Sequence, residues 1–343
     1  ILMSLKGDKK PVAFIEDCAV TLDHLADYTS RLKEVFAKYN TNGMFYAHAS
    51  VGTLHVRPVL NMKSDQDIKN MKAIAEEAFD MVKEYRGSHS GEHGDGIVRS
   101  EFHEKMFGKK ILNTFEEIKD TFDKKNLLNP HKIVRAYKSD DRSLMRYKAD
   151  YKAENISTHY DWSEWGQFSD AVEMCNNNGA CRKLDSGVMC PSYRVTKEEK
   201  DLVRGRANTL RLALSNQLPK DSFVSKEMYK TMELCVSCKA CQRECPMSVD
   251  MAKMKSEFLS HYYKKFTMGL KDTVISNMPK LIWLLKITNP IINKLNKLPL
   301  FSQIIEWFGF SSKRSLPVVE KQTPLREIYS TQPNLEKKVI LFA

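Results

Sequence analysis

The sequence predicts an α+β protein, in which a small domain of strands and helices precedes a mainly helical domain rich in cysteine. Two observations support this division. Apolar residues in the first part of the chain switch between strand-like runs and the three-to-four-residue spacing of helices. Seven of the eight cysteines lie in two groups between residues 175 and 245, where helical spacing dominates.

The first domain, residues 1–137, reads in the order β-α-β-β-α-β. The expected elements are a strand at 11–20, a helix at 23–39, strands at 44–48 and 53–60, a helix after a capping box at 64–67, and a strand at 87–93. This order is typical of the ferredoxin-like split βαβ arrangement, with both helices on one face of the sheet. A third helix is indicated by four apolar residues at helical spacing: Ile111, Phe115, Ile118 and Phe122.

Three further segments follow the first domain. Residues 138–160 are charged and poorly periodic, which is typical of a linker, and 161–265 form the helical cysteine domain. Residues 266–343 read as amphipathic helices cut by Pro279, Pro290 and Pro299, ending in the first strand of another domain at 337–343. Because the chain also starts without methionine, we expect a fragment of a longer protein.

Composition narrows the class of protein. A hydrophobic content of 42% is that of a globular chain, and grouped thiols indicate a reducing, cytoplasmic location. Cys18, in an apolar run, is expected to be a buried small side chain. The net charge of +11 is spread along the chain without a nucleic-acid motif, so we expect no nucleic-acid partner. Peripheral contact with the inner face of a membrane is an alternative to simple packing for the apolar pieces after residue 266.

Four cysteines define the clearest motif: Cys235, Cys238, Cys241 and Cys245 are separated by two, two and three residues, and proline follows. This is the bacterial ferredoxin pattern for a 4Fe–4S cluster. A structural zinc site also uses paired cysteines, but it needs neither the third close thiolate nor the Cys-Pro pair. The motif therefore favours iron and sulfide.

An upstream group, Cys175, Cys181 and Cys190, also ends in Cys-Pro. This suggests that Cys190 crosses over to complete the cluster held by Cys235, Cys238 and Cys241. Cys175, Cys181 and Cys245 then remain for a second cluster, one thiolate short. That second site is absent, completed by another ligand, or left with an open iron position.

Two histidines seven residues apart, His48 and His55, flank the expected hairpin tip Val51-Gly52. A two-residue tip would make them a direct cross-strand pair with Cβ atoms ~5 Å apart, close enough to share a metal ion. A carboxylate is available at Glu92, in the glycine-rich segment Ser90–Gly96. Packing and hydrogen bonding are the alternative roles for these histidines.

These residues, together with Leu127-Leu-Asn-Pro130, resemble the carboxy-terminal domain of FAD-linked oxidases of the D-lactate and D-2-hydroxyglutarate dehydrogenase group. The cysteine region resembles the 4Fe–4S module fused behind that domain in large bacterial dehydrogenases. The resemblance implies that His48, His55 and Glu92 bind a divalent metal such as zinc or manganese, that His93 is the catalytic base, and that Asn129 lies near the flavin. It also implies that the amino-terminal domain holding most of the FAD is missing, so that the fragment alone is inactive.

The implied activity is oxidation of a D-2-hydroxyacid to the 2-oxoacid, with hydride passing to FAD and electrons leaving through one or two 4Fe–4S clusters. The downstream acceptor would be a quinone, a cytochrome or an electron carrier. The alternative is a non-catalytic iron–sulfur subunit, like those of glycolate oxidase or anaerobic glycerol-3-phosphate dehydrogenase. That subunit would need the cysteines but not the histidines and Glu92.

Overall fold

The computed structural model describes residues 4–295, 298–311 and 313, and the chain divides into two compact units. The first unit, residues 1–262, contains both the predicted first domain and the cysteine region. The second unit comprises residues 263–343. The strand expected at 337–343 lies outside the described residues.

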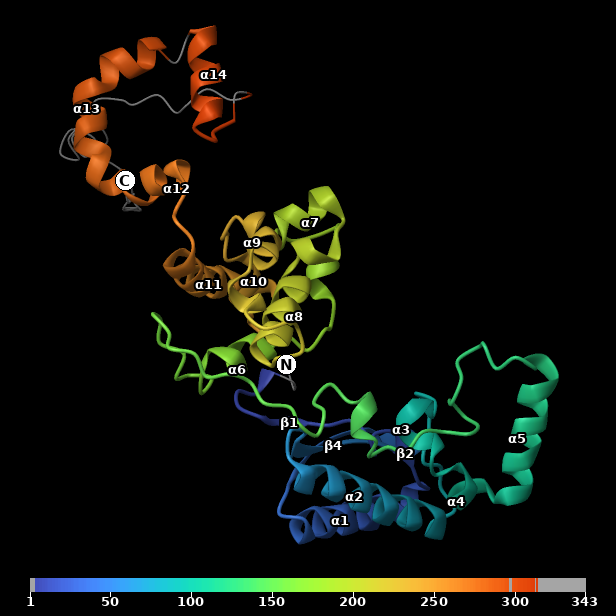
Figure 1. The fold of residues 1–343 in the computed structure, drawn as a ribbon. Coiled ribbons are helices and arrows are strands. Elements are labelled where there is room, and N and C mark those ends of the chain that lie inside the picture. The colour runs from blue at the N-terminus through green and yellow to red at the C-terminus, as the bar shows by residue number, and fades with distance from the viewer. Residues whose placement is uncertain (1–3, 296–297, 312, 314–343) are drawn as a thin grey trace, which may run out of the picture. The chain divides into compact units, whose positions relative to one another are not determined.

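A small antiparallel sheet forms the centre of the amino-terminal part (Figure 1). Its longest strand, β4 (Thr53–Asn61), pairs with β3 (Gly43–His48) along Thr53–Pro58. The single strand expected at 11–20 is instead two short strands, β1 (Lys9–Pro11) and β2 (Cys18–Ala19), which pair with opposite ends of β4.

The strand expected at 87–93 is wrong, because among the described residues only the bridge Ala19↔Ser88 forms there. Beyond Ser88 the backbone N–H groups turn towards the side chain of Asp17 and leave the ladder. Directly after this segment, Gly94 and Gly96 adopt φ of +77° and +55°, which a regular strand does not allow. This segment is therefore a loop.

Helices α1 (Leu22–Lys38) and α2 (Asp65–Glu84) lie side by side on the sheet (Figure 1). Their apolar stripes meet the sheet in one core that includes Tyr28, Phe36, Ile74 and Phe79. The predicted cap is present, since Ser64 Oγ accepts a hydrogen bond from the Asp67 N–H at 3.4 Å. Cys18 is buried in the same core, as expected.

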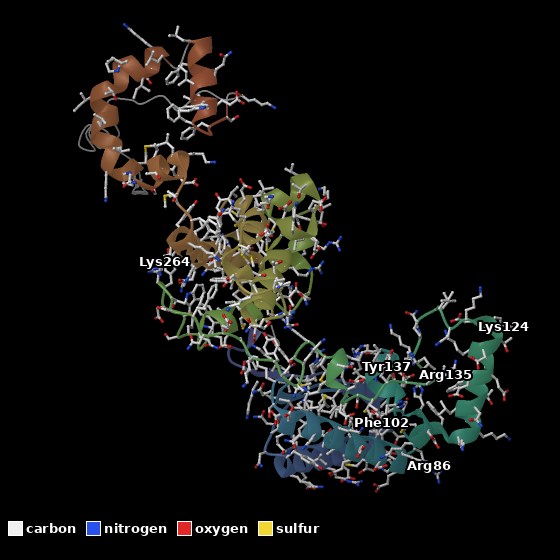
Figure 2. The ribbon with its side chains drawn as sticks, in the orientation of Figure 1. Arg86, Phe102, Lys124, Arg135, Tyr137 and Lys264 are labelled. Atoms are coloured by element: carbon white, nitrogen blue, oxygen red, sulfur yellow. The ribbon has the colours of Figure 1, made fainter. Side chains whose placement is uncertain are left out.

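Three helices follow the loop: α3 (Gly96–Ser100), α4 (His103–Phe107) and α5 (Lys109–Phe122). The predicted third helix is thus confirmed as α5. An ion pair connects α5 to the segment that follows it. Asp120 Oδ1 lies 2.7 Å from the guanidinium of Arg135, which Figure 2 labels.

The cysteine region is helical, as predicted, with six helices among the described residues: α6 (Phe168–Glu173), α7 (Pro191–Thr196), α8 (Val203–Leu214), α9 (Lys226–Glu233), α10 (Ala240–Glu244) and α11 (Met251–Lys265). Glu257 of α11 is fully buried. Its carboxylate accepts hydrogen bonds from the backbone of His159 and Tyr160 and from the Trp162 indole at 2.9–3.0 Å. One buried carboxylate therefore joins α11 to the segment before α6.

The second unit contains α12 (Leu270–Ser276), α13 (Met278–Leu295) and α14 (Pro299–Trp307). The expected break at Pro290 is wrong, since this residue lies inside α13. A helix can continue through proline at the cost of one backbone hydrogen bond and local strain. None of the described helices is long and apolar enough to cross a membrane.

Candidate active site

One carboxylate oxygen lies among three imidazoles. Glu92 Oε1 is 3.3 Å from Nε2 of His48, 3.2 Å from Nε2 of His55 and 3.3 Å from Nε2 of His93. His48 ends β3, His55 is on β4, and Glu92 and His93 lie in the loop before α3. The structure therefore brings together all four residues that the sequence indicated.

The pairing of the two strands differs from the expected register. His48 faces Thr53, and His55 faces Tyr46, so the two histidines are diagonal neighbours and not a direct pair. The cause is the turn: residues Ala49–Val51 form a 3₁₀ turn, and only Gly52 takes a positive φ, of +70°. Val51 is β-branched and unsuited to that conformation. A shift of two residues keeps both imidazoles on the same face.

The imidazoles pack against one another. The His55 ring stacks at a centroid distance of 4.8 Å on Tyr46 and 5.0 Å on His93, and His48 meets it edge-on at 5.1 Å. His55 is buried, with 2% of its side chain exposed, whereas His48 and Glu92 expose 60% and 46%. The group formed by Glu92 and the three histidines is therefore packed against the protein at His55 and exposed to solvent at His48 and Glu92.

Sequence reasoning missed Asp17, which holds the loop in place. This fully buried residue has a φ of 80°, and its carboxylate accepts hydrogen bonds from the N–H of Glu92 at 2.9 Å and of His93 at 2.7 Å. Burial opposes ionisation, but these two N–H donors hold the pKa of Asp17 below its usual value. Gly91 passes so close that a Cβ would lie 3.2 Å from Asp17 O. No local motif marks Asp17.

Glu16 is a second residue that the sequence did not indicate. Its Oε1 lies 3.2 Å from Nδ1 of His93, and its other oxygen accepts a hydrogen bond from Arg57 Nε. An N–H at Nδ1 facing Glu16 leaves the lone pair of His93 on Nε2, the atom that faces Glu92. Glu16 thus places a negative charge beside Nδ1 of His93.

Four cysteines from two distant segments line one small cavity: Cys190, Cys235, Cys238 and Cys241. Cys190 directly precedes α7 and lies in the left-handed region, at φ 53°. Its Sγ accepts a hydrogen bond from the Val203 N–H at 3.2 Å. Burial raises the pKa of Cys190 to about 12 and that of Cys241 to about 11. A cation is therefore needed to hold these sulfurs as thiolates at neutral pH.

The other three cysteines form a separate group. Cys175 lies within electrostatic range of both Cys245 and Cys181. Burial raises the pKa of Cys175 and of Cys181. Arg146 donates a hydrogen bond to the carbonyl oxygen of Cys175 at 2.7 Å, which places a positive charge beside the group. Cys175 is thus the member that links Cys181 with Cys245.

Asn129 lies outside the histidine cluster. It has a φ of 48° and lines a cavity with Phe115, Ile118, Leu128 and other residues between α5 and the segment 128–134. Gly96, just after the glycine-rich loop, lies on the same cavity wall. The structure therefore places Asn129 beside an open pocket and not at the imidazoles.

Comparison with protein families gives the class of protein. Residues 2–133 match the C-terminal domain of FAD linked oxidases, and residues 171–249 match the 4Fe-4S dicluster domain. The chain thus combines a domain of the FAD-linked oxidases with an iron–sulfur module, which confirms the resemblance seen in the sequence. The two matches also support FAD and an iron–sulfur cluster as cofactors.

Individual relatives narrow the class further. The chain is 28% identical to a D-2-hydroxyglutarate dehydrogenase of Haemophilus influenzae, over 98% of this chain and 36% of that protein. It is 28% identical to the enzyme of that name from Escherichia coli, over 87% of this chain and 33% of that protein. A D-lactate dehydrogenase of Archaeoglobus fulgidus is 30% identical over 39% of this chain and 29% of that protein. The chain thus spans about a third of the length of these curated relatives.

Proposed function

We propose that this chain carries the substrate and electron-transfer part of a D-2-hydroxyacid dehydrogenase, with a substrate of the D-2-hydroxyglutarate or D-lactate class. The observation that carries the proposal is the position of Glu92 Oε1, 3.2–3.3 Å from three imidazole nitrogens. Packing alone does not require three nitrogens around one oxygen. The names of the relatives support this choice of substrate.

His48, His55 and Glu92 would hold a divalent metal such as zinc or manganese, because two imidazoles and a carboxylate suit both ions. Such an ion supplies Lewis acidity towards the 2-hydroxyl oxygen of the substrate. The open side of the centre, formed by the exposed edges of His48 and Glu92, leaves room for that oxygen.

His93 would take the hydroxyl proton at Nε2. Its Nδ1 lies 3.2 Å from Glu16 Oε1, so the carboxylate would favour a proton on Nδ1 and stabilise the imidazolium that forms. Arg57 Nε forms an ion pair with the other oxygen of Glu16 at 2.5 Å and holds that carboxylate in place. Asp17 holds His93 through its backbone N–H.

FAD supplies the hydride acceptor in oxidases of this class. In this chain Asn129 would approach the flavin from the cavity that it lines. The scaffold would be a ferredoxin-like split βαβ unit, which the order β1/β2–α1–β3–β4–α2 and the bridge Ala19↔Ser88 support.

Electrons would leave through the cysteine region. Cys190, Cys235, Cys238 and Cys241 would bind one 4Fe–4S cluster, and Cys175, Cys181 and Cys245 an incomplete second one. The acceptor would be a quinone, a cytochrome or a soluble carrier, met in the cytoplasm or at the inner face of the membrane. A purely electron-transferring subunit would not need His48, His55 and Glu92, so their convergence argues against that alternative.

The test uses the full-length protein that contains this chain. We would measure bound metal and the bleaching of flavin absorbance by D-lactate and D-2-hydroxyglutarate, for wild type, His48→Ala, Glu92→Ala and His93→Ala. Loss of a metal ligand should remove both metal and bleaching. His93→Ala should keep the metal but slow bleaching by about a hundredfold or more. Normal bleaching in all three variants would contradict the proposal.

A further inference from the structure

A second group of imidazoles and a carboxylate lies in the first unit, separate from Glu92. His89 Nε2 is 3.2 Å from Asp95 Oδ1, and His103 Nε2 is 3.2 Å from Asp95 Oδ2. His89 precedes the glycine-rich loop, Asp95 ends it, and His103 begins α4. One carboxylate thus faces two imidazoles from different parts of the chain.

The polar atoms of this group lack hydrogen-bond partners among the described residues. Each histidine exposes only 1% of its side chain. The orphaned atoms are both ring nitrogens of His89, Nε2 of His103 and Oδ1 of Asp95. The nitrogen–oxygen distances are short, but the geometry is not that of hydrogen bonds. Buried polar groups in folded proteins nearly always have a hydrogen-bond partner, so four orphaned atoms in one place point to a missing partner.

The other contacts of His103 and His89 are those expected around a bound cation. The Nδ1 of His103 lies 2.8 Å from the carbonyl oxygen of Ile133, so an N–H at Nδ1 donates there and the lone pair of Nε2 points at Asp95. A backbone carbonyl that fixes the tautomer in this way is a regular feature of metal-binding histidines. Aromatic rings complete the surroundings, with Phe79 and Phe107 at centroid distances of 5.5 and 5.6 Å from His89.

We propose that His89, Asp95 and His103 bind a second divalent cation of the zinc class. The donor set, two imidazoles and one carboxylate, is one that zinc accepts, and water can fill the fourth position at the 22% exposed edge of Asp95. This ion is distinct from the one proposed at Glu92, and the proposal does not depend on the catalytic activity.

The ion would brace the loop that carries Glu92 and His93. His89 and Asp95 stand at the two ends of that loop, and His103 belongs to α4. A cation bound by all three would fasten both ends of the loop to the helix. It would thereby hold Glu92 and His93 against His48 and His55 without touching the substrate.

The test counts zinc by mass spectrometry in the full chain with its iron–sulfur site loaded, after equilibration with zinc and removal of the free metal. Loading the cysteines with iron prevents them from binding zinc. The variants are Asp95→Asn and His103→Gln, each alone and combined with Glu92→Gln. His131→Gln is the matched control, since Nδ1 of His131 also lies 2.9 Å from a backbone carbonyl, that of Arg135, and His131 belongs to neither group.

We expect Asp95→Asn and His103→Gln each to lose one zinc per chain, in the wild-type and in the Glu92→Gln background, and His131→Gln to lose none. Zinc should also raise the melting temperature of wild type more than that of Asp95→Asn, because the ion binds only the folded loop. Zinc contents equal to that of the parent in both variants would overturn the proposal. A Glu92→Gln protein that keeps all its zinc would instead count against the catalytic metal alone.

Discussion

The carboxylate of Asp17 can be tested as the support of the active-site loop by the substitution Asp17→Asn. The Asp17 side chain is buried and accepts hydrogen bonds from the N–H groups of Glu92 and His93. Both N–H groups donate to Oδ2, and the Glu92 N–H also reaches Oδ1 at 3.0 Å, so an amide removes the negative charge from both bonds. A hydrogen bond to a charged group contributes about 1.5–3 kcal/mol and a neutral one about 1 kcal/mol, so the two bonds together lose about 2 kcal/mol. If the free energy of opening falls by about 2 kcal/mol, the loop should open about thirtyfold more often.

Hydrogen–deuterium exchange at the amides of Glu92 and His93 measures this opening, together with zinc affinity at the neighbouring imidazoles. The matched control is Asp123→Asn, because Asp123 also accepts two backbone N–H bonds, from Leu127 and Leu128 at 3.0 and 2.9 Å. That control should speed exchange only in its own turn. Unchanged exchange at Glu92 and His93 in Asp17→Asn would refute the reasoning.

Three further predictions concern the cysteines, the buried carboxylate of α11 and the hairpin. Cys190→Ala should damage the cluster held by Cys235, Cys238 and Cys241, and Cys245→Ala should spare it. Electron paramagnetic resonance of the two reduced variants distinguishes these outcomes. The reverse pattern would mean that Cys245 completes the cluster of its own motif. Glu257→Gln should weaken the acid dependence of stability: burial raises the pKa of Glu257, but hydrogen bonds from the Trp162 indole and two backbone N–H groups outweigh it and leave that pKa lowered. Its contribution is therefore present above the unfolded pKa of about 4.3 and lost as pH falls through the folded value, which urea unfolding at pH 7 and pH 4 would show. Gly52→Ala should destabilise the fold and reduce metal binding, because φ is +70° and a Cβ would lie 1.9 Å from Val20 O; urea unfolding that matches wild type would contradict this.

Local patterns were sufficient to predict much of this protein. The helices around Tyr28 and Ile74 follow from apolar spacing, because each buries one stripe of its surface in the core. The helix around Phe115 has the same spacing but buries none of its residues. The cysteine spacing indicated the iron–sulfur module because three of the ligands of such a cluster come from one short loop. The segments around His48 and Glu92 pointed to the oxidase family by resemblance.

Only the tertiary structure decided how distant residues meet. The register that makes His48 and His55 diagonal neighbours depends on a turn at Gly52, whose Cβ position is filled by the backbone of Val20. Asp17 acts through backbone N–H groups more than seventy residues away, and such a contact leaves no pattern in the sequence.

The same holds for the buried group at His89. His89, Asp95 and His103 occupy no recognised metal-binding spacing, and they meet because α4 folds back beside the loop. Sequence periodicity reports which face of an element is buried, since burial repeats with the turn of the backbone. It does not report which polar atoms meet across the core, because those contacts arise once for each pair and depend on how the elements pack.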